Sequence, residues 1–453
     1  MVRTNSMRNR RLAFIAILAA GALAVCALLR PWSSGPSYQG KSAAQWLKLY
    51  RSSSIAERED ARDAFKALGD QAVPYLFSVL TRSRGLSLLR PYEKVWSKLP
   101  QPLRKILPRV SAGDTNSEAA KALLSDARPS AKVLMPRLKP WLSSPEHPRH
   151  GQALLLLGYV GEGAAEGVPF VIRALQNTNR YHRAFATQSI WKLGAEARAA
   201  VPALIGALDD PATRIRAIRA LGDIGPAAKD AVPRLEQLLV TTDRLAAATA
   251  LHKINPQGNY LRLLIDALGD PNLRSAAIQG LSELGQAAMP ALDTMLKALK
   301  TEGGRDRVGG PQSMTIADAL RKISPTNREV ILILIEKLKD VERPDRQDTA
   351  AVPLARSAYG FGAVSTKSDR LNIASRLVWF DPAEPHGLNV LIETLRSDPE
   401  PARRDFAAYT LRQAGPGAAA AIPALKAALH DKDETVRRAA ASALRRMESP
   451  GAK

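Results

Sequence analysis

The chain has 453 residues and a formal net charge of +22, and aromatic residues make up only 5% of it although 45% of its residues are apolar. Small and aliphatic apolar residues without many aromatic ones favour a helical protein. The single cysteine, Cys26, excludes disulfide and zinc-thiolate chemistry from the rest of the chain. The basic balance favours a polyanionic partner.

Residues 12–29 form an uncharged apolar run that follows a basic tail, residues 1–11, with four arginines. A run of this length is about long enough to span a bilayer as a helix. The positive-inside rule predicts that the tail stays in the cytoplasm and that the remainder is exported. We therefore expect a signal anchor and a single-pass inner-membrane protein whose repeats face the periplasm or exterior. Cleavage after Ala22-Leu23-Ala24 and a lipoprotein signal ending at Cys26 remain as alternatives.

A linker, residues 30–41, and a capping helix, residues 42–56, are predicted next. Ser42 and Gln45 have the spacing of a capping box, in which each residue bonds the other's backbone at a helix start. One apolar face of this helix is formed by Trp46, Leu47 and Tyr50. That face is expected to cover the open core of the first repeat.

An apolar residue followed by proline recurs at spacings close to multiples of about 31 residues. The dipeptides are Val73-Pro74, Met135-Pro136, Val168-Pro169, Val201-Pro202, Val232-Pro233, Met289-Pro290 and Ile422-Pro423. Proline is tolerated in the first turn of a helix, so regular prolines mark regular helix starts. The chain is therefore predicted to repeat one small helical unit.

The segment 209–239 shows the unit most clearly. An Asp-Pro turn precedes a first helix, which Gly222 and Gly225 are expected to stop because glycine adopts the left-handed cap conformation without a steric penalty. Pro233 then begins a second helix. The apolar positions are Ile215, Ala217, Ile218, Ala220 and Leu221 in the first helix and Leu235, Leu238 and Leu239 in the second. One unit is thus a helical hairpin.

About ten hairpins are predicted, the first at residues 57–80 and the others within 114–453, where a last helix at 433–447 has no second helix. No hairpin buries its apolar stripe alone, so the hairpins are expected to stack into one continuous core. The predicted fold class is all-α, an α-solenoid or superhelix with one N-terminal transmembrane helix. We expect the second helices to line its concave face.

The string A-L-G-x-x-G followed by A-V-P-x-L resembles HEAT repeats, specifically the short bacterial kind related to the phycobilin-lyase repeat, and the resemblance extends over about residues 57–447. This motif is specific for architecture and says little about function. The resemblance implies a ladder between repeats, in which an Asp at the turn pairs with an Arg of the following helix. The matching pairs are Asp210 with Arg214 or Arg216, Asp270 with Arg274, Asp398 with Arg404, and Asp433 with Arg437. These arginines are therefore expected to be structural.

An insertion at residues 81–113 interrupts the repeats and mixes basic with aromatic side chains, which suits docking onto an anionic surface. The candidate partner-binding or anion-binding residues are Arg82, Arg84, Arg90, Trp96, Lys98, Arg104, Lys105 and Arg109. The alternative is a helical insertion that packs Trp96 and Leu103 on the adjacent repeat and leaves its basic face in solvent. A second interruption, residues 301–312, is predicted to be a flexible insertion because it lacks a phosphate-loop sequence.

The sequence offers no catalytic constellation. None of its six histidines is followed by Glu, so the metal site of iron-dependent hydroxylases built on HEAT-like repeats has no counterpart. We also find no nucleophile elbow, zinc-binding His-Glu-x-x-His or phosphate loop. We expect no catalytic, cofactor or metal site.

The predicted function is that of a non-enzymatic, membrane-tethered scaffold in the bacterial envelope. Its expected partners are proteins, or an anionic lipid or acidic polysaccharide drawn by the basic charge. Two alternatives are kept. One is a nucleic-acid-binding protein similar to DNA glycosylases of the HEAT-like kind, which contact phosphates through a cationic concave face; the other is a bilin-lyase-like enzyme. The apolar N-terminal segment argues against both.

Overall fold

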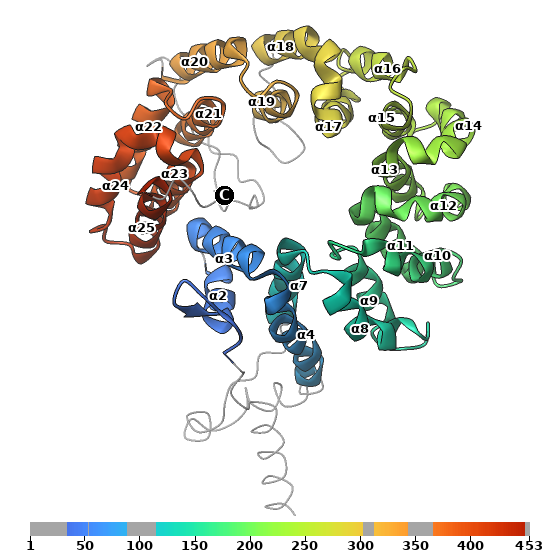
Figure 1. The fold of residues 1–453 in the computed structure, drawn as a ribbon. Coiled ribbons are helices and arrows are strands. Elements are labelled where there is room, and N and C mark those ends of the chain that lie inside the picture. The colour runs from blue at the N-terminus through green and yellow to red at the C-terminus, as the bar shows by residue number, and fades with distance from the viewer. Residues whose placement is uncertain (1–33, 53, 88–114, 302–311, 343–365, 449–453) are drawn as a thin grey trace, which may run out of the picture. The chain divides into compact units, whose positions relative to one another are not determined.

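The computed structural model describes residues 34–52, 54–87, 115–301, 312–342 and 366–448 (Figure 1). These residues are mostly helical, as predicted, and they divide into two compact units. The first unit contains the chain up to Arg51 together with Ala61–Leu134, and the second contains Ser52–Asp60 together with the chain from Met135 onward. The division falls inside helices α3 (Ile55–Leu68) and α8 (Ala131–Leu142).

The first unit begins with a hairpin that the sequence analysis did not predict, because two-residue strands show no hydrophobic period. Strands β1 (Ser37–Tyr38) and β2 (Lys41–Ser42) pair antiparallel across a turn at Gln39 and Gly40. Helix α2 (Ala43–Tyr50) follows with the predicted capping box: Ser42 Oγ accepts from the N–H of Gln45, and Gln45 Oε1 accepts from the N–H of Ser42. Trp46 is buried and donates to the carbonyl of Tyr38 at 3.1 Å, so the hairpin and α2 form one piece.

Polar contacts and an apolar core hold the remaining elements of the first unit together. These elements are the part of α3 after Asp60, the 3-10 helix η1 (Gly69–Ala72), α4 (Val73–Ser87), α7 (Thr115–Ala127) and the start of α8. Arg62 donates from Nε and Nη2 to the two carboxylate oxygens of Asp126, both at 2.9 Å. Phe65, Leu76 and Leu123 are fully buried.

The second unit is a succession of short helices. Its α-helices after α8 are α9 (His150–Leu157), α10 (Val168–Leu175), α11 (Arg180–Leu193), α12 (Val201–Ala207), α13 (Arg214–Ile224), α14 (Val232–Glu236), α15 (Arg244–Ile254), α16 (Tyr260–Ala267), α17 (Arg274–Leu284), α18 (Leu292–Thr301), α19 (Gln312–Ile323), α20 (Arg328–Glu342), α21 (Thr366–Phe380), α22 (Pro385–Ser397), α23 (Pro401–Ala414), α24 (Ile422–Ala428) and α25 (Glu434–Glu448). Short 3-10 helices join several of them: η2 (Ala164–Gly167), η3 (Gly194–Ala200), η4 (Gly225–Ala231), η5 (Gln237–Val240), η6 (Gly285–Ala291) and η7 (Gly415–Ala421).

The hairpin predicted at 209–239 consists of α13, η4 and α14. Pro233 lies in the first turn of α14, as predicted, and Gly225 ends α13 with a φ of +74°. The expected stop at Gly222 is wrong, because this glycine lies inside α13 and is buried. Ile215, predicted as a core residue, is 37% exposed, whereas Ile218 and Leu221 are fully buried. The two glycines of A-L-G-x-x-G therefore have different roles, and only the second ends the helix.

The helices of the second unit form two layers along a curve (Figure 1). The first helices of the hairpins, such as α13, α15 and α17, lie on the inner side, and the second helices, such as α14, α16 and α18, lie on the outer side. The expectation that second helices line the concave face is therefore wrong for this unit. The first helices carry alanine and glycine where they meet, which allows them to lie closer together than the second helices.

No helix in the described part of the chain is both long and apolar enough to cross a membrane. The prediction of a single-pass inner-membrane protein conflicts with this finding and is withdrawn as wrong. The tail at 1–11 and the apolar run at 12–29, on which that prediction rested, lie outside the described residues.

Candidate protein-binding site on the inner helices

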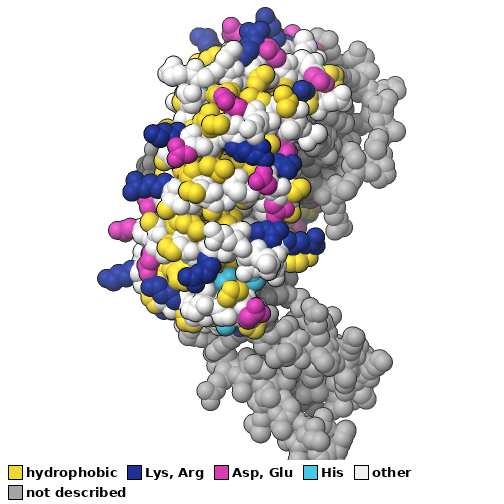
Figure 2. All heavy atoms as spheres, turned by 90° about the vertical axis from the view of Figure 1, so that its right-hand side faces the viewer, with side chains coloured by type: hydrophobic (Ala, Val, Ile, Leu, Met, Phe, Trp, Pro, Cys, Tyr) yellow, Lys and Arg dark blue, Asp and Glu magenta, His cyan; other side chains and the backbone are white. Residues whose placement is uncertain are grey.

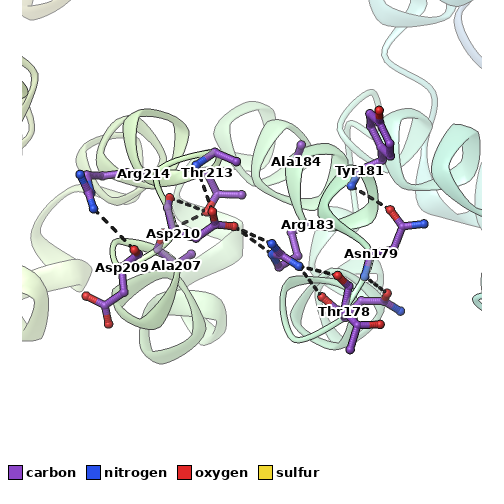
Figure 3. Close-up of polar contacts among 12 residues, drawn as sticks. Thr178, Asn179, Tyr181, Arg183, Ala184, Ala207, Asp209, Asp210, Thr213 and Arg214 are labelled. Carbon is purple, nitrogen blue, oxygen red and sulfur yellow. Dashed lines mark hydrogen bonds and ion pairs between the residues drawn. The ribbon is translucent and has the colours of Figure 1, made fainter.

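Arginines near the start of several inner helices connect one repeat to the next (Figure 3). Arg183 of α11 donates from Nη1 to the backbone carbonyls of Asn177 and Thr178 at 3.0 and 2.8 Å. Its Nε donates to Asp210 Oδ2 at 3.0 Å, 27 residues later in the chain. The arginine therefore closes its own turn and joins that turn to the next repeat.

Arg404 of α23 makes the same contacts from a buried position. Its Nη1 donates to the carbonyl of Asp398 at 2.7 Å, and Nε and Nη2 donate to the carboxylate of Asp431, again 27 residues later. The predicted pairing of Arg404 with the Asp398 carboxylate is wrong, since that carboxylate accepts from Arg403. The structural role expected for Arg404 is confirmed.

The other predicted pairs, which join an Asp to an Arg of its own repeat, are wrong for the same reason: the arginine bonds a backbone carbonyl instead of the Asp carboxylate. Arg274 donates to the carbonyl of Leu268 and Arg437 to that of Asp431, each six residues earlier. Arg214 donates to the carbonyl of Leu208 at 2.7 Å, and its Nη1 lies 3.8 Å from the Asp243 carboxylate in the following repeat. Within its own repeat each of these arginines therefore uses backbone carbonyls, and Arg183, Arg214 and Arg404 also reach a carboxylate of the next repeat.

The ladder carboxylates are held in their charged form. A hydrogen bond from the N–H of Ala212 lowers the pKa of Asp210, burial opposes it, and the hydrogen bond and charge of Arg183 lower that pKa further. Burial raises the pKa of Asp431, but hydrogen bonds from Arg404 and the N–H of Asp433 bring it below its ordinary value. Both carboxylates therefore stay charged and keep their ion pairs with Arg183 and Arg404 of the preceding repeats.

Two glycines set the close approach of the inner helices. A Cβ placed on Gly222 of α13 would lie 2.9 Å from the Cα of Ala250 in α15. A Cβ on Gly280 of α17 would lie 2.5 Å from Thr249 Oγ1, also in α15. The atom near Gly222 belongs to the backbone and cannot turn aside, so α13 packs this closely on α15 only with glycine at this position. The atom near Gly280 is a side-chain hydroxyl, so a methyl group there would require Thr249 to shift.

A hollow of about 180 Å³ opens on the inner surface where α13, α15 and α17 meet. Its residues are Ile215, Arg219 and Gly222 from α13; Thr242, Asp243, Leu245, Ala246, Thr249, Ala250 and Lys253 from α15 and the turn before it; and Leu273, Ala276, Gln279, Gly280 and Glu283 from α17 and the residue before it. Small side chains create the space, aliphatic ones provide an apolar lining, and charged ones lie around it. This site is not predicted by the sequence pattern, in which Gly222 has the position of a helix stop.

The charged residues beside the hollow alternate in sign across the three helices. Lys253 Nζ lies 2.8 Å from Asp223 Oδ1 and 3.9 Å from Glu283 Oε2. Arg219 Nη2 lies 3.9 Å from Glu283 Oε1. Both basic groups thus have acidic neighbours, an arrangement unlike the single-sign basic surface that phosphate backbones require.

The face of the second unit that Figure 2 shows carries charges of both signs. Figure 2 shows basic and acidic side chains interspersed over it, with hydrophobic side chains between them. Leu263 of the outer-layer helix α16, for example, is 41% exposed and is flanked by Arg262, which pairs with Asp266. Single exposed apolar residues of this kind are ordinary for a protein surface.

The binding residues predicted in the 81–113 insertion fall almost entirely outside the described part of the chain. Arg82 and Arg84 lie in the last turns of α4, but their side chains are not described. The other six, Arg90, Trp96, Lys98, Arg104, Lys105 and Arg109, lie outside the described residues, as does most of the second insertion. That these residues form one site therefore stays a prediction.

Two histidines meet between α9 and α11. His150 is buried, its Nδ1 lies 3.2 Å from the carbonyl of Trp141, and its ring centroid lies 4.7 Å from that of His182. Burial lowers the pKa of His150, the bond to the Trp141 carbonyl opposes this, and the neighbouring His182 lowers it again. Across the described ranges, no three His, Cys, Asp or Glu side chains gather as metal ligands would.

Comparison with known proteins supports the repeat assignment. The family model for HEAT repeats matches residues 168–250 and 388–453. No curated protein matches the chain.

Solved structures with similar folds are distant from this chain. The complex of CpcE and CpcF of phycocyanin lyase from Nostoc sp. is 20% identical, with 67% of this chain and 96% of that chain covered, at a TM-score of 0.32. Importin beta is 13% identical, with 89% and 55% covered, at a TM-score of 0.35, and Kap121p is 13% identical, with 88% and 53% covered, at 0.36. At these scores they carry no argument about function. The family match and the hairpins together establish that the chain contains HEAT repeats at residues 168–250 and 388–453.

Proposed function

We propose that this chain is a non-enzymatic scaffold that binds a protein partner in the hollow between α13, α15 and α17. The observation that carries the proposal is the hollow itself, which has an apolar lining, alternating charges beside it and a glycine, Gly222, packed against the backbone of α15. Repeat proteins use the extended inner surface of the solenoid for binding.

The size of the hollow supports a polypeptide partner. Pockets for drug-sized molecules and cofactors enclose about 300–1,000 Å³, and this one has about 180 Å³. It suits one apolar side chain of a partner, while the groups around it, such as Arg219 and Gln279, are placed to bond the partner's backbone or polar side chains. The mixed signs disfavour a nucleic acid.

The proposal is tested by placing a photo-crosslinking amino acid at Ala276, which is exposed at the hollow, in cells that naturally make the protein. The matched control carries the same amino acid at Leu263 on the outer layer. We expect a protein adduct of defined mass at position 276 and none at 263. A second change, Ala246→Arg, should fill the hollow and remove the adduct.

Equal adducts at both positions would show non-specific contact and contradict the proposal, as would an adduct that Ala246→Arg leaves unchanged. An adduct that nuclease digestion removes would replace the protein partner with a nucleic acid.

A further inference from the structure

The segment Ser52–Asp60 belongs to the second unit and lies against its last helices, about 350 residues later in the chain. Ser54 is fully buried and donates from Oγ to Asp405 Oδ1 at 3.0 Å. The N–H of Ile55, the first residue of α3, donates to Asp405 Oδ2 at 3.3 Å. Asp405 of α23 therefore caps the start of α3, where an acidic group is favourable.

Asp60 anchors the other end of the segment. Its Oδ1 accepts from Arg412 Nε of α23 at 3.0 Å and from Ser442 Oγ of α25 at 2.7 Å. Its Oδ2 accepts from Arg445 Nη2, also of α25, at 3.0 Å. One carboxylate thus bridges two helices of the terminal repeats.

Glu57 lies between these anchors. Its Oε1 accepts from Arg438 Nη1 of α25 at 2.8 Å. Its Oε2 is buried and has no hydrogen-bond partner among the described residues. A buried polar atom without a partner costs free energy, and desolvation offsets much of the gain of a buried ion pair. The contact between Glu57 and Arg438 therefore helps to fix where the segment lies but adds little to the free energy that holds it there.

The attachment of this segment differs from the packing of the helices beneath it. The hydrophobic cluster that holds α23 and α25 contains fully buried Leu411 and Ala440. From Ser52–Asp60, the side chain packed against that cluster is Ile55, which is only partly buried. Few buried apolar contacts and reliance on polar groups are features of elements that open locally.

We propose that the face formed by α23 and α25 is a docking surface for the acidic segment Ser52–Asp60 and that the segment detaches from it without unfolding the repeats. Its occupant is this chain's own segment, chosen by the match of Glu57 and Asp60 to Arg412, Arg438 and Arg445. Docking gives α25 contacts with Glu57 and Asp60. It is separate from the partner site on α13, α15 and α17.

Hydrogen exchange of the full chain tests the proposal. The double variant Glu57→Gln/Asp60→Asn removes both carboxylates at nearly constant volume. We expect amide exchange within residues 55–60 to accelerate about tenfold or more through local opening, while exchange in α13, α15 and α17 stays unchanged. The matched control is Asp63→Asn, further along α3, where the carboxylate pairs with Lys66 and no effect on residues 55–60 is expected.

A milder variant guards against a folding defect. Arg445 is 62% exposed, so Arg445→Gln removes one partner of Asp60 without opening a cavity. It should accelerate exchange in residues 55–60 in the same direction but less, about two- to fivefold. If exchange in α13, α15 and α17 rises by the same factor as in 55–60, the segment is an integral part of the fold and the proposal fails. Unchanged exchange at 55–60 in both variants also overturns it.

Discussion

Arg404 donates hydrogen bonds from Nε and Nη2 to the two carboxylate oxygens of Asp431 at 2.8 and 2.7 Å, although only 4% of the arginine side chain is exposed. Replacing Arg404 with Ala leaves the Asp431 carboxylate nearly buried without its partner. We expect the free energy of unfolding of the C-terminal repeats to fall by about 3–5 kcal/mol, as when one member of a buried ion pair is removed. Urea unfolding followed by hydrogen exchange in α23 and α25 measures this.

An exposed ion pair provides the control for that experiment. Arg262 pairs with Asp266 within α16, and both side chains are more than half exposed. Arg262→Ala should change stability by less than about 0.5 kcal/mol, because exposed pairs contribute little. If both variants cost the same, burial is not what makes the ladder arginines stabilising.

Replacement of glycine by alanine should lower the stability of the protein where a Cβ would meet a neighbouring helix and raise it where a Cβ would meet nothing. Gly222→Ala places a methyl group 2.9 Å from the Cα of Ala250, which is backbone and cannot turn aside. We expect a loss of about 1–3 kcal/mol, typical of overpacking. Thermal unfolding, together with the shape of the hollow in a crystal structure of the variant, would report the change.

Gly206 of α12 is the matched position on the outer layer, since a Cβ there meets nothing within 4 Å. Gly206→Ala should stabilise the protein by about 0.5–1 kcal/mol, because alanine favours helix and restricts the unfolded chain. A gain in stability for Gly222→Ala would contradict the role assigned to this glycine in helix packing.

The hairpins were predictable from the sequence because each boundary has a local cause. Proline favours the first turn of a helix, as at Pro233, and glycine adopts the positive φ that ends α13 at Gly225. The prediction that every such proline marks a helix start is wrong at Pro136, which lies inside α8. Periodic alanines and leucines then identify the buried faces. These signals lie within a few residues of the structure that they determine.

The ladder pairing and the hollow were not predictable in the same way. The carboxylate partner of Arg404 lies in the next repeat, and local spacing favours the nearer Asp398, whose carbonyl it takes instead. The role of Gly222 depends on Ala250, a residue of a different helix. The contact between Ser54 and Asp405 joins positions 351 residues apart, and no periodic pattern encodes it.

Acid should weaken the packing of α9 on α11. Burial, opposed by the Trp141 carbonyl and assisted by His182, lowers the pKa of His150 below 6.5, so the unfolded chain binds a proton more readily than the folded one. Stability from this group is therefore present above pH 6.5 and is lost as the pH falls below it. Unfolding measured between pH 7.5 and 5.5 should show this loss.

His150→Asn keeps a donor for the Trp141 carbonyl and removes the titrating ring. We expect this variant to lose less stability than the wild type over the same pH interval. His430→Asn changes an exposed histidine of the same unit and should keep the wild-type dependence. Identical pH profiles for all three proteins would exclude His150 as the source.

The docked segment Ser52–Asp60 should respond to pH in the opposite direction. Burial raises the pKa of Asp405 from 3.8 to about 6. The hydrogen bonds from the Ile55 N–H and from Ser54 and the charge of Arg58 act to lower this pKa, and the charge of Glu57 acts to raise it. Because the docked state binds a proton at Asp405 more readily, the stabilisation that Asp405 contributes is complete below pH 3.8 and is lost as the pH rises through 6. The basic groups that face the segment are Arg412 of α23 and Arg445 of α25, both paired with Asp60, and Arg438 of α25, paired with Glu57.

Asp405→Asn imitates the protonated carboxyl, since its amide can donate to Ser54 Oγ and accept from the Ile55 N–H. We expect the protection factors of residues 55–60, corrected for intrinsic exchange, to fall between pH 5 and 7.5 in the wild type and to stay level in the variant. Above pH 6 the variant should be the better protected of the two, because it avoids burying a charge. A variant less protected than the wild type at pH 7.5 would mean that the charged carboxylate, as a helix cap, outweighs its desolvation.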